Sequence, residues 1–529
     1  MKLKDITKPG FDRTPWEEKG YLLPKFDIQA MRERTFAAPT WIHFGAGNLF
    51  RALPAAILQK MLDAGDYDRS VIVVGGHDTE AIERNYHDND NLTLLVLLRS
   101  DGTVEKRVIA SVTEALRSDP GFTDDAARLK DIFKNPSLQM VSFTITEKGY
   151  AAPEDDRARG LAPQRPMGKV AALLLERFGA GAYPITLQSM DNCARNGDVV
   201  RDAVFSYAKT WAQAGLAPGA FLDYLQDENL VSYPWSMVDK ITPRPDKTVQ
   251  EMLRADGFSD AEIGTTAKGT LVGAFVNAEE TQYLVLEDKY TNGRPPLERG
   301  GVLFAGRETV SLVEKMKVGT CLNPLHTAMA IFGCLLGYTR ISEEMKDADI
   351  VGLITKMAYK ESMPVVQDPG ILKPVDFLEA VLKRRFPNPF LPDAPQRIAE
   401  DTSQKLPIRY GQTIRAYLER GLDLDELTLI PLVFAAYARY LRGIDDTGKP
   451  FTPSPDPKLE ELRTIVAGLE VTEQPQDMSC LRELFSRAEI FGANLYQAGL
   501  GERAEAMTAE LYAGPGAVRR TLHRYVTNK

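Results

Sequence analysis

Residues 314–328, EKMKVGTCLNPLHTA, combine side chains that can hold a hydroxyl group and move its proton. Asn323 followed by Pro324 predicts a helix start, with Asn323 as the N-cap and Pro324 at the first helical position. As an N-cap, Asn323 would accept a backbone N–H through its oxygen and keep its amide N–H groups for a ligand. His326 falls at the third helical position, where the helix dipole favours a neutral imidazole.

Lys317 precedes Asn323 by six residues and is expected to reach the same rim from a loop. Oxidation of an alcohol needs a base for the hydroxyl proton and donors for the developing alkoxide. Without a metal, a lysine and amide groups can do both. An ordinary helix cap, a structural histidine and a surface lysine are the alternative interpretation of these residues.

A second amide donor is expected at Asn192, within the segment SMDNCARNG (189–197). This segment follows an apolar run at 184–189 that reads as a strand. Ligands of parallel α/β sheets bind beyond the carboxyl ends of their strands. Asn192 is therefore a candidate to share the site with Lys317.

The motif GAGNLFR (45–51) lies between a predicted strand and a predicted helix, as a dinucleotide-binding turn does. Gly45 would allow the tight turn, and Gly47 would let backbone N–H groups approach a pyrophosphate. Asn48 and Arg51 complete the predicted cofactor contacts. The third glycine of the fingerprint is replaced by Phe50, so a glycine turn in another α/β sheet is an equal alternative.

Asp78 follows the next predicted strand and is the candidate to bind the cofactor ribose. Its charge would repel a 2′-phosphate and so favour NAD over NADP. It lies further from Gly45 than the usual spacing of about twenty residues. A cap of the helix predicted at 79–85 is the alternative role.

The predicted elements give an α/β protein with a helical second half. Apolar strands are expected at 40–44, 71–76, 91–98, 140–146 and 184–189, with helices between them, which is typical of a doubly wound parallel sheet. Long amphipathic helices dominate from about residue 315. We therefore predict a Rossmann-type domain over residues 1–298 and a mostly helical domain over 299–529, with the Gly- and Pro-rich segment 291–301 as the hinge.

Composition narrows the classes of partner. The chain has 44% hydrophobic and 26% charged residues, as in a globular enzyme. A net charge of -9 argues against nucleic acid. The first twenty residues lack a signal peptide's apolar core, and no apolar run is long enough for a bilayer. Four cysteines without a CxxC pair and five scattered histidines argue against a metal centre. We expect a cytoplasmic, metal-free monomer or small homo-oligomer.

Seven segments together resemble the polyol-specific long-chain dehydrogenases, the family of the mannitol 2-dehydrogenases and fructuronate reductases. They are GAGNLFR (45–51), TITEKGY (144–150), SMDNCARNG (189–197), YPWSMVDKITP (233–243), YLVLED (283–288), the segment around Lys317, and RIAEDTSQKLPIR (397–409). The resemblance implies NAD as cofactor, a Rossmann domain, a helical domain and a site between the two.

The resemblance also implies a role for each matching residue. Lys317 matches the family's catalytic lysine, although its spacing to Asn323 is one residue longer here, so that Lys315 is a remote alternative. Asn192 and Asn323 match the asparagines that stabilise the alkoxide, and His326 matches the family histidine. Asp239 matches the family aspartate, as a partner of a substrate hydroxyl or of the lysine, and Arg397 and Lys405 match the cations on the substrate side.

The expected substrate is a sugar acid or a polyol. Arg397 and Lys405 suit a substrate carboxylate. The segment NPLHTA (323–328) resembles the corresponding segment of the hexuronate reductases. Both observations favour the reduction of D-fructuronate to D-mannonate. Mannitol 2-dehydrogenase, another polyol dehydrogenase and tagaturonate reductase are the alternatives within the enzyme class. A non-catalytic module that binds nucleotide or sugar acid is the alternative outside it.

Overall fold

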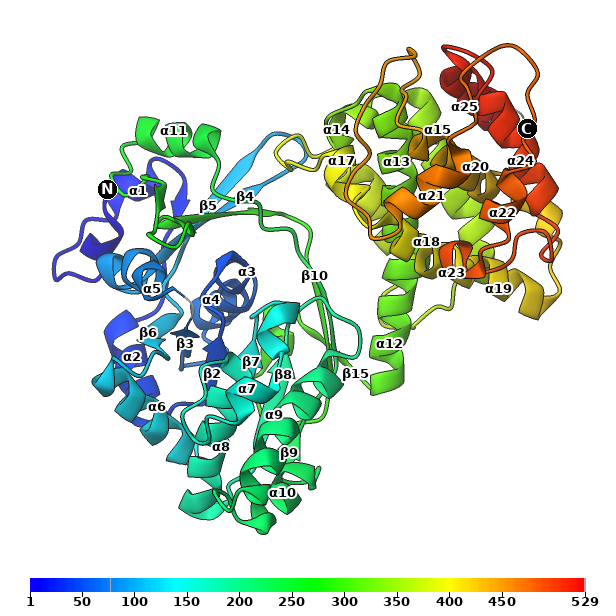
Figure 1. The fold of residues 1–529 in the computed structure, drawn as a ribbon. Coiled ribbons are helices and arrows are strands. Elements are labelled where there is room, and N and C mark those ends of the chain that lie inside the picture. The colour runs from blue at the N-terminus through cyan, green and yellow to red at the C-terminus, as the bar shows by residue number, and fades with distance from the viewer. Residues whose placement is uncertain (77, 528–529) are drawn as a thin grey trace. The chain divides into compact units, whose positions relative to one another are not determined.

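The computed structural model describes residues 1–76 and 78–527, which form two compact units (Figure 1). The first comprises Met1–Arg99 and Thr103–Ser311, and the second comprises Ser100–Gly102 and the chain from Leu312 onward. The sequence prediction divided the chain between residues 298 and 299. The structure divides it later, because β15 (Leu303–Ala305) pairs in parallel with β14 (Tyr283–Glu287) of the first unit.

A parallel sheet of six strands organises the first unit, as the sequence predicts. In spatial order its strands are β6 (Val112–Arg117), β3 (Val71–Gly75), β2 (Trp41–Phe44), β7 (Met140–Phe143), β8 (Ile185–Ser189) and β9 (Val231–Ser232). All neighbouring strands run parallel. Counted along the chain, the order is the 3-2-1-4-5-6 of the doubly wound Rossmann fold, which reverses direction between β2 and β7.

Alternate residues of each strand enter the cores on opposite faces of this sheet. Ile42 and Phe44 join one core with Ile72 and Val74, whereas Trp41 joins the other with Val71 and Val73. Both faces are apolar because helices cover both. In Figure 1, α8 (Pro166–Gly181) and α9 (Asn196–Gln213) lie on one side and α4 (Pro54–Ala64) on the other.

The predicted strand at 91–98 forms, but it lies outside the parallel sheet. It is β4 (Thr93–Leu98), and it pairs antiparallel with β5 (Val104–Ile109). Their four-stranded sheet has the order β1 (Tyr21–Leu22), β5, β4 and β13 (Phe275–Glu279). The expectation that this strand joins the doubly wound sheet is wrong, because the chain reverses directly after it: the Arg99 N–H donates to the Thr103 oxygen at 3.1 Å, and Gly102 takes a left-handed φ of 85°. On its other side β4 pairs in parallel with β13.

Smaller strands and the helices complete the first unit. β10 (Ser236–Asp239) pairs with β14, and β11 (Gly264–Thr265) pairs with β12 (Leu271–Val272). The remaining helices are α1 (Thr14–Glu17), α2 (Ile28–Ala37), α3 (Asn48–Ala52), α5 (Thr79–Asn85), α6 (Thr123–Lys134), α7 (Glu154–Arg157), α10 (Gly219–Gln226) and α11 (Lys247–Ala255).

The segment 291–301, predicted as a hinge, is packed against the first unit. Asn292 Nδ2 donates to the Leu138 oxygen at 2.7 Å, and Thr291 Oγ1 donates to the Ile185 oxygen at 3.1 Å. At Gly300 an added Cβ would lie 2.5 Å from Ile57 Cγ2, so the backbone itself packs on α4. Its prolines and glycines shape a close-packed turn, and not a free linker.

The second unit is helical, and the long helices predicted after residue 315 are confirmed. Its main elements are α12 (Arg307–Met316), which starts in the first unit, the π-turn η5 (Lys317–Cys321), α13 (Asn323–Leu336), α14 (Ile341–Glu344), α15 (Ala348–Lys356), α16 (Pro374–Ala380), α17 (Pro395–Ile398), α18 (Thr402–Arg409), α19 (Gly411–Arg420), α20 (Leu429–Leu441), α21 (Leu459–Val466), α22 (Leu481–Phe485), α23 (Ala488–Phe491), α24 (Gly501–Leu511) and α25 (Ala517–Thr527).

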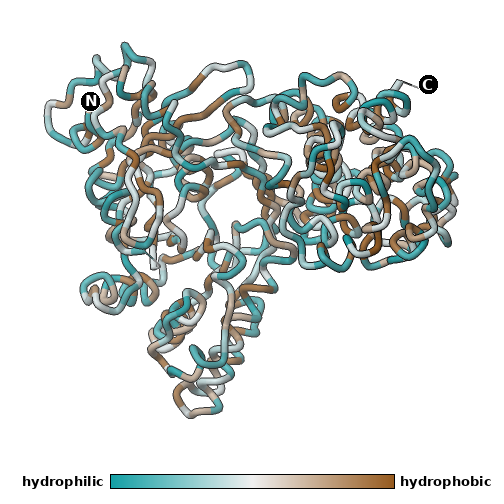
Figure 2. The backbone as a smooth tube through the Cα atoms, turned by 45° about the horizontal axis from the view of Figure 1, so that its top comes forward, coloured by the Kyte–Doolittle hydropathy of each residue, from teal (hydrophilic) through white to brown (hydrophobic). Residues whose placement is uncertain are grey.

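Hydrophobic stretches concentrate in the interior of each unit, and hydrophilic ones follow the outer loops (Figure 2). The run Arg307–Leu336 is long and apolar enough to cross a bilayer by length and composition. Its most apolar window is 83% buried in the structure, as in the core helix of a globular domain.

Candidate active site

The glycine turn after β2 lies at the point where the strand order of the sheet reverses. Gly45 has a φ of 118°, and a Cβ placed on it would lie 2.1 Å from the Thr144 oxygen at the end of β7. The Gly45 N–H donates to the Val74 oxygen at 2.9 Å. Only glycine fits between these two strands. Ligands of open α/β sheets bind at such a reversal point.

The residues after Gly45 form the start of α3. Gly47 is its N-cap, and no atom lies within 4 Å of a Cβ added there, so space remains open in front of the helix. Arg51 is only 1% exposed, and it donates to Asn48 Oδ1 and to the Gly273 oxygen, both at 2.8 Å. Arg51 therefore holds Asn48 in place. Direct contact of Arg51 or Asn48 with a cofactor stays a prediction.

Replacing Gly45 by alanine is expected to lower the free energy of unfolding by about 1–3 kcal/mol, because the new Cβ meets Thr144 and φ is unfavourable. It should also weaken NADH binding about tenfold. Gly47→Ala is the matched control: its φ is -83° and its surroundings are open, so stability should not change. Urea unfolding measures the first effect and NADH fluorescence titration the second. Equal stability of the two variants would contradict this account of Gly45.

Asp78 takes the cap role that the sequence left open. Its Oδ1 accepts from the Ala81 N–H at 3.4 Å at the start of α5, and its Oδ2 accepts from Thr266 Oγ1 at 2.6 Å. Burial alone would raise the pKa of Asp78, but hydrogen bonds, chiefly from Thr266, hold it below the usual value. The carboxylate is thus fixed at the end of β3, and contact with a ribose stays a prediction.

Asn192 lies exposed in the loop after β8, and its neighbour Asp191 fixes this loop. Asp191 accepts from the Ile145 N–H at 2.8 Å, the Thr146 N–H at 3.2 Å and the Tyr150 hydroxyl at 2.7 Å. Thr146 is held at a φ of 63° and ψ of 166°, which is unfavourable for threonine. Asp191 was not predicted as a site residue, although it lies within the segment 189–197. It connects the loops after β7 and β8.

Asn196 connects the same loop to β10, which ends at Asp239. Its Nδ2 donates to the Asp191 oxygen at 2.9 Å and to Ser236 Oγ at 2.8 Å, and its Oδ1 accepts from the Ser236 N–H at 2.9 Å. Asp239 is 5% exposed. The first unit therefore carries two predicted site residues, Asn192 and Asp239, on segments that one buried hydrogen-bond network positions.

The other predicted catalytic residues belong to the second unit, and the local structure corrects two expectations. Lys317 is the first residue of the π-turn η5 and is 3% exposed, so it does not lie in a loop. Leu322 is the N-cap of α13, and Asn323 is the first helical residue. The N-cap prediction is wrong because the π-turn continues α12 almost directly into α13, which leaves no loop for a cap. The Asn323 side chain makes no hydrogen bond to a described residue.

His326 lies at the fourth helical position and not the third, since its N–H donates to the Leu322 oxygen at 3.0 Å. Its ring packs 5.2 Å from Phe386, and its Nε2 lies 3.6 Å from Asp393 Oδ2, beyond hydrogen-bond distance. Burial lowers the pKa of His326 to about 4, although the Asp393 carboxylate opposes this shift. The neutral imidazole is as predicted, but burial is its main cause.

The buried imidazole gives a prediction for the pH dependence of stability. The folded state binds fewer protons than the unfolded state between pH 4 and 6.5, so the free energy of unfolding falls as pH falls through this range. His326→Asn should reduce the proton uptake on unfolding at pH 5 by about one proton. Urea unfolding between pH 4.5 and 7 measures this slope. His43 is also buried with a lowered pKa, so part of the slope remains in the variant.

His523→Asn is the control, because that side chain is 62% exposed. The same slope in His326→Asn as in the unmodified protein would contradict a histidine buried in the neutral form.

Basic side chains surround Asn323 and His326. Arg409 Nη1 donates to the Asn323 oxygen at 3.3 Å and to Thr327 Oγ1, and burial lowers the pKa of Arg409 to about 10. Lys405 Nζ donates to the Ile398 oxygen at 3.1 Å and to the Glu400 oxygen.

Two further arginines belong to the same group. Arg397, which is 60% exposed in its side chain, pairs with Asp393, and Arg385 is 2% exposed. Electrostatic interactions with His326 come from one carboxylate, that of Asp393, and from Arg409, Arg397 and Arg385. Arg385, Asp393 and Arg409 were not predicted as site residues, although Arg409 ends the segment 397–409. We call Arg385, Arg397, Lys405 and Arg409 the basic cluster.

Within residues 1–76 and 78–527, no group of three or more His, Cys, Asp or Glu side chains could hold a metal ion. Metal independence of the reaction stays a prediction.

Comparison with known proteins supports the same fold and family. Residues 39–299 match the mannitol dehydrogenase Rossmann domain, and residues 310–507 match the mannitol dehydrogenase C-terminal domain. A D-mannonate oxidoreductase of Thermotoga maritima is 47% identical, covering 97% of both chains. A polyol:NADP oxidoreductase of Gluconobacter oxydans is 29% identical, covering 84% of this chain and 87% of its own.

Two solved structures share the fold over nearly the whole chain. The complex of Pseudomonas fluorescens mannitol 2-dehydrogenase with NAD and D-mannitol has a TM-score of 0.69 and 27% identity, covering 98% of this chain and 99% of its own. A substrate-free D-sorbitol dehydrogenase has a TM-score of 0.78 and 24% identity, covering 95% of this chain and 97% of its own. From these matches, the chain belongs to the mannitol dehydrogenase family.

Proposed function

We propose that the protein is an NAD-dependent dehydrogenase that reduces D-fructuronate to D-mannonate. The observation that carries the choice of substrate is the basic cluster, where four cations gather near Asn323 and His326. Asp393 pairs with Arg397, and the carboxylates of Asp401 and Glu400 act on Lys405. Arginine and lysine side chains gathered at one site suit a substrate carboxylate. The 47% identity to a D-mannonate oxidoreductase supports the same assignment.

The turn after β2 suits a dinucleotide. Gly45 lets the ends of β2 and β7 approach each other closely. Gly47 leaves open space in front of α3, where a pyrophosphate would meet backbone N–H groups. Asp78 stands at the end of β3 to accept from the ribose hydroxyls, which favours NAD over NADP. Bound NADH supplies the hydride that the keto carbon accepts.

The side chains of this protein handle the oxygen and its proton. The Lys317 ammonium gives a proton to the carbonyl oxygen as negative charge develops there, and the amides of Asn192 and Asn323 donate to that oxygen. Neutral His326 holds a substrate hydroxyl. Asp239 accepts from another hydroxyl, and Arg397 and Lys405 bind the carboxylate. In the reverse direction neutral Lys317 is the base, and no step requires a metal.

The test is NADH oxidation by the purified protein at neutral pH, with D-fructuronate, D-tagaturonate and D-fructose offered in parallel, with and without EDTA. Turnover of fructuronate at least about tenfold faster than of the others, insensitive to EDTA, is the expected result. Preference for fructose would replace the proposal with a mannitol 2-dehydrogenase, and preference for tagaturonate with its isomeric reductase. Loss of activity with EDTA would overturn the metal-free mechanism, and no turnover of any substrate would favour a binding module.

A further inference from the structure

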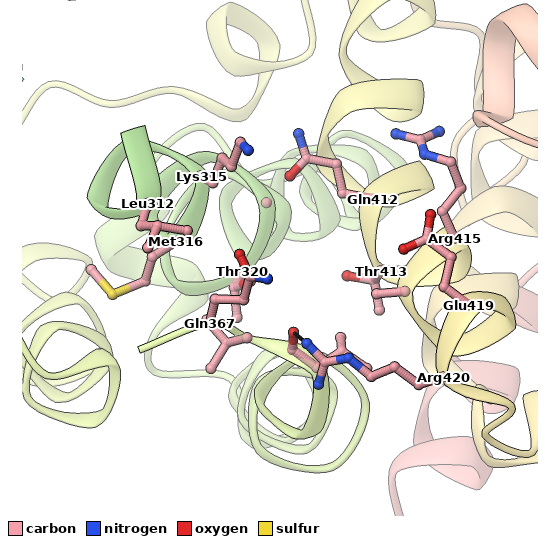
Figure 3. Close-up of a pocket in the computed structure, with 14 residues that line it drawn as sticks. Leu312, Lys315, Met316, Thr320, Gln367, Gln412, Thr413, Arg415, Glu419 and Arg420 are labelled. Carbon is pink, nitrogen blue, oxygen red and sulfur yellow. Dashed lines mark hydrogen bonds between the residues drawn. The ribbon is translucent and has the colours of Figure 1, made fainter. Parts of the chain in front are cut away.

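A pocket of about 360 Å³ lies in the second unit, between α12, the π-turn η5 and α19 (Figure 3). Its remaining wall comes from residues 365–367. None of the residues assigned above to substrate or cofactor lines it. Its volume is at the lower end of the range for small-molecule sites.

Several polar side chains that line this pocket have no hydrogen-bond partner in the described part of the chain. The side chains of Lys315, Thr320, Gln367, Gln412 and Thr413 make no hydrogen bond to any residue within 1–76 and 78–527. Thr320 and Thr413 are only 7% and 3% exposed. Neither hydroxyl oxygen is fully covered by protein, so both are open to the pocket and can bind a polar molecule there.

The arrangement in Figure 3 brings these groups together from separate elements. Lys315 of α12 and Gln412 of α19 point toward one another across one end of the pocket, and Thr320 of η5 and Thr413 of α19 stand on its two sides. These donors and acceptors can bind several oxygen atoms of one ligand at once.

The charge of the lining favours an anion. Lys315, Arg415 and Arg420 line the pocket with Glu419 as the one acidic residue among its lining residues. Arg420 also donates to the oxygens of Pro364 and Val365, and Arg415 donates once to that of Gly492. Lys315 is thus the one of these three cations that donates to no described residue, and the net charge of the lining is positive.

We propose that this pocket binds a small anion that carries hydroxyl groups, a sugar phosphate or a sugar acid, at a site separate from the basic cluster. Lys315 binds the charged group, and Thr320, Gln412 and Thr413 bind hydroxyl groups. Because Thr320 belongs to the same π-turn as Lys317, an occupied pocket also holds that turn in place.

Isothermal titration calorimetry on the full chain tests the proposal, with glucose 6-phosphate, gluconate and inorganic phosphate as probes. We expect saturable binding of at least one of the two sugar anions, tighter than of phosphate, and the preferred sugar anion identifies the charged group. Lys315→Gln should weaken it at least about tenfold, and Thr413→Val about threefold. Lys346→Ala is the control, since that exposed lysine pairs with Glu343 on the surface and does not line the pocket. Its affinity should stay within twofold.

Three results would overturn the proposal. One is no binding of either sugar anion at 10 mM, a concentration far above a useful affinity. Another is unchanged binding in both pocket variants. The third is binding that Lys405→Met abolishes and Lys315→Gln preserves, which would assign the anion to the basic cluster. Thermal unfolding of each variant confirms that it is folded.

Discussion

Replacing Lys317 by alanine is expected to lower kcat for the reduction of the keto acid by about 10²- to 10⁴-fold, while NADH still binds. The side chain is 3% exposed, so its ammonium works in a site from which most water is excluded. No neighbouring lysine replaces it, because Lys315 is exposed and lines the separate pocket. Single-turnover NADH oxidation measures the chemical step, and fluorescence titration measures NADH binding.

Two comparisons separate proton transfer from loss of packing. Lys317→Met keeps the apolar stem, and it should be as slow as Lys317→Ala if the amine is what matters. Added methylamine should restore part of the activity of Lys317→Ala, because a small amine can enter the space that the side chain leaves. Lys315→Ala should lower kcat less than about threefold. A larger loss in Lys315→Ala than in Lys317→Ala would move the role to Lys315.

The Rossmann sheet could be predicted from the sequence because its signals are local. Each buried strand is a short apolar run that ends at a turn, and Gly45 follows the first of them. The position of β4 could not be predicted the same way, because its apolar run resembles those of the parallel strands. Its pairing with β5, set by the turn at Gly102, and with β13 places it in another sheet.

The candidate site was predictable where residues are close in sequence and less so where they meet through the fold. An Asn-Pro pair is a strong cap signal, but a π-turn has no comparable signature, so the helix before Asn323 was missed. Arg409 binds the Asn323 backbone from 86 residues away. Asp393 lies close to His326 in space but far from it along the chain, so the sequence did not indicate that these two side chains interact.

The second large effect is expected from Lys405→Met, which should lower kcat/KM for D-fructuronate about 10- to 100-fold, mainly through KM. The ammonium donates to two backbone oxygens at the C-terminal end of α17, and its third N–H remains for a substrate carboxylate. Burial lowers the pKa of Lys405, with a further lowering by Arg409. A buried cation of this kind is stabilised when an anionic ligand binds beside it. Fructose has no carboxylate, so its kcat/KM should fall less than about threefold.

The ratio of the two losses distinguishes binding of the carboxylate from support of the fold. Because Lys405 also holds the backbone oxygens of Ile398 and Glu400, its loss could disturb α17 and so affect every substrate. In that case fructuronate and fructose would lose activity equally, and the assignment of Lys405 to the carboxylate would be wrong. Lys405→Arg, which keeps the charge, should recover much of the fructuronate activity. Lys449→Met, at an exposed position of the same unit, should change neither substrate, which excludes a general effect of net charge.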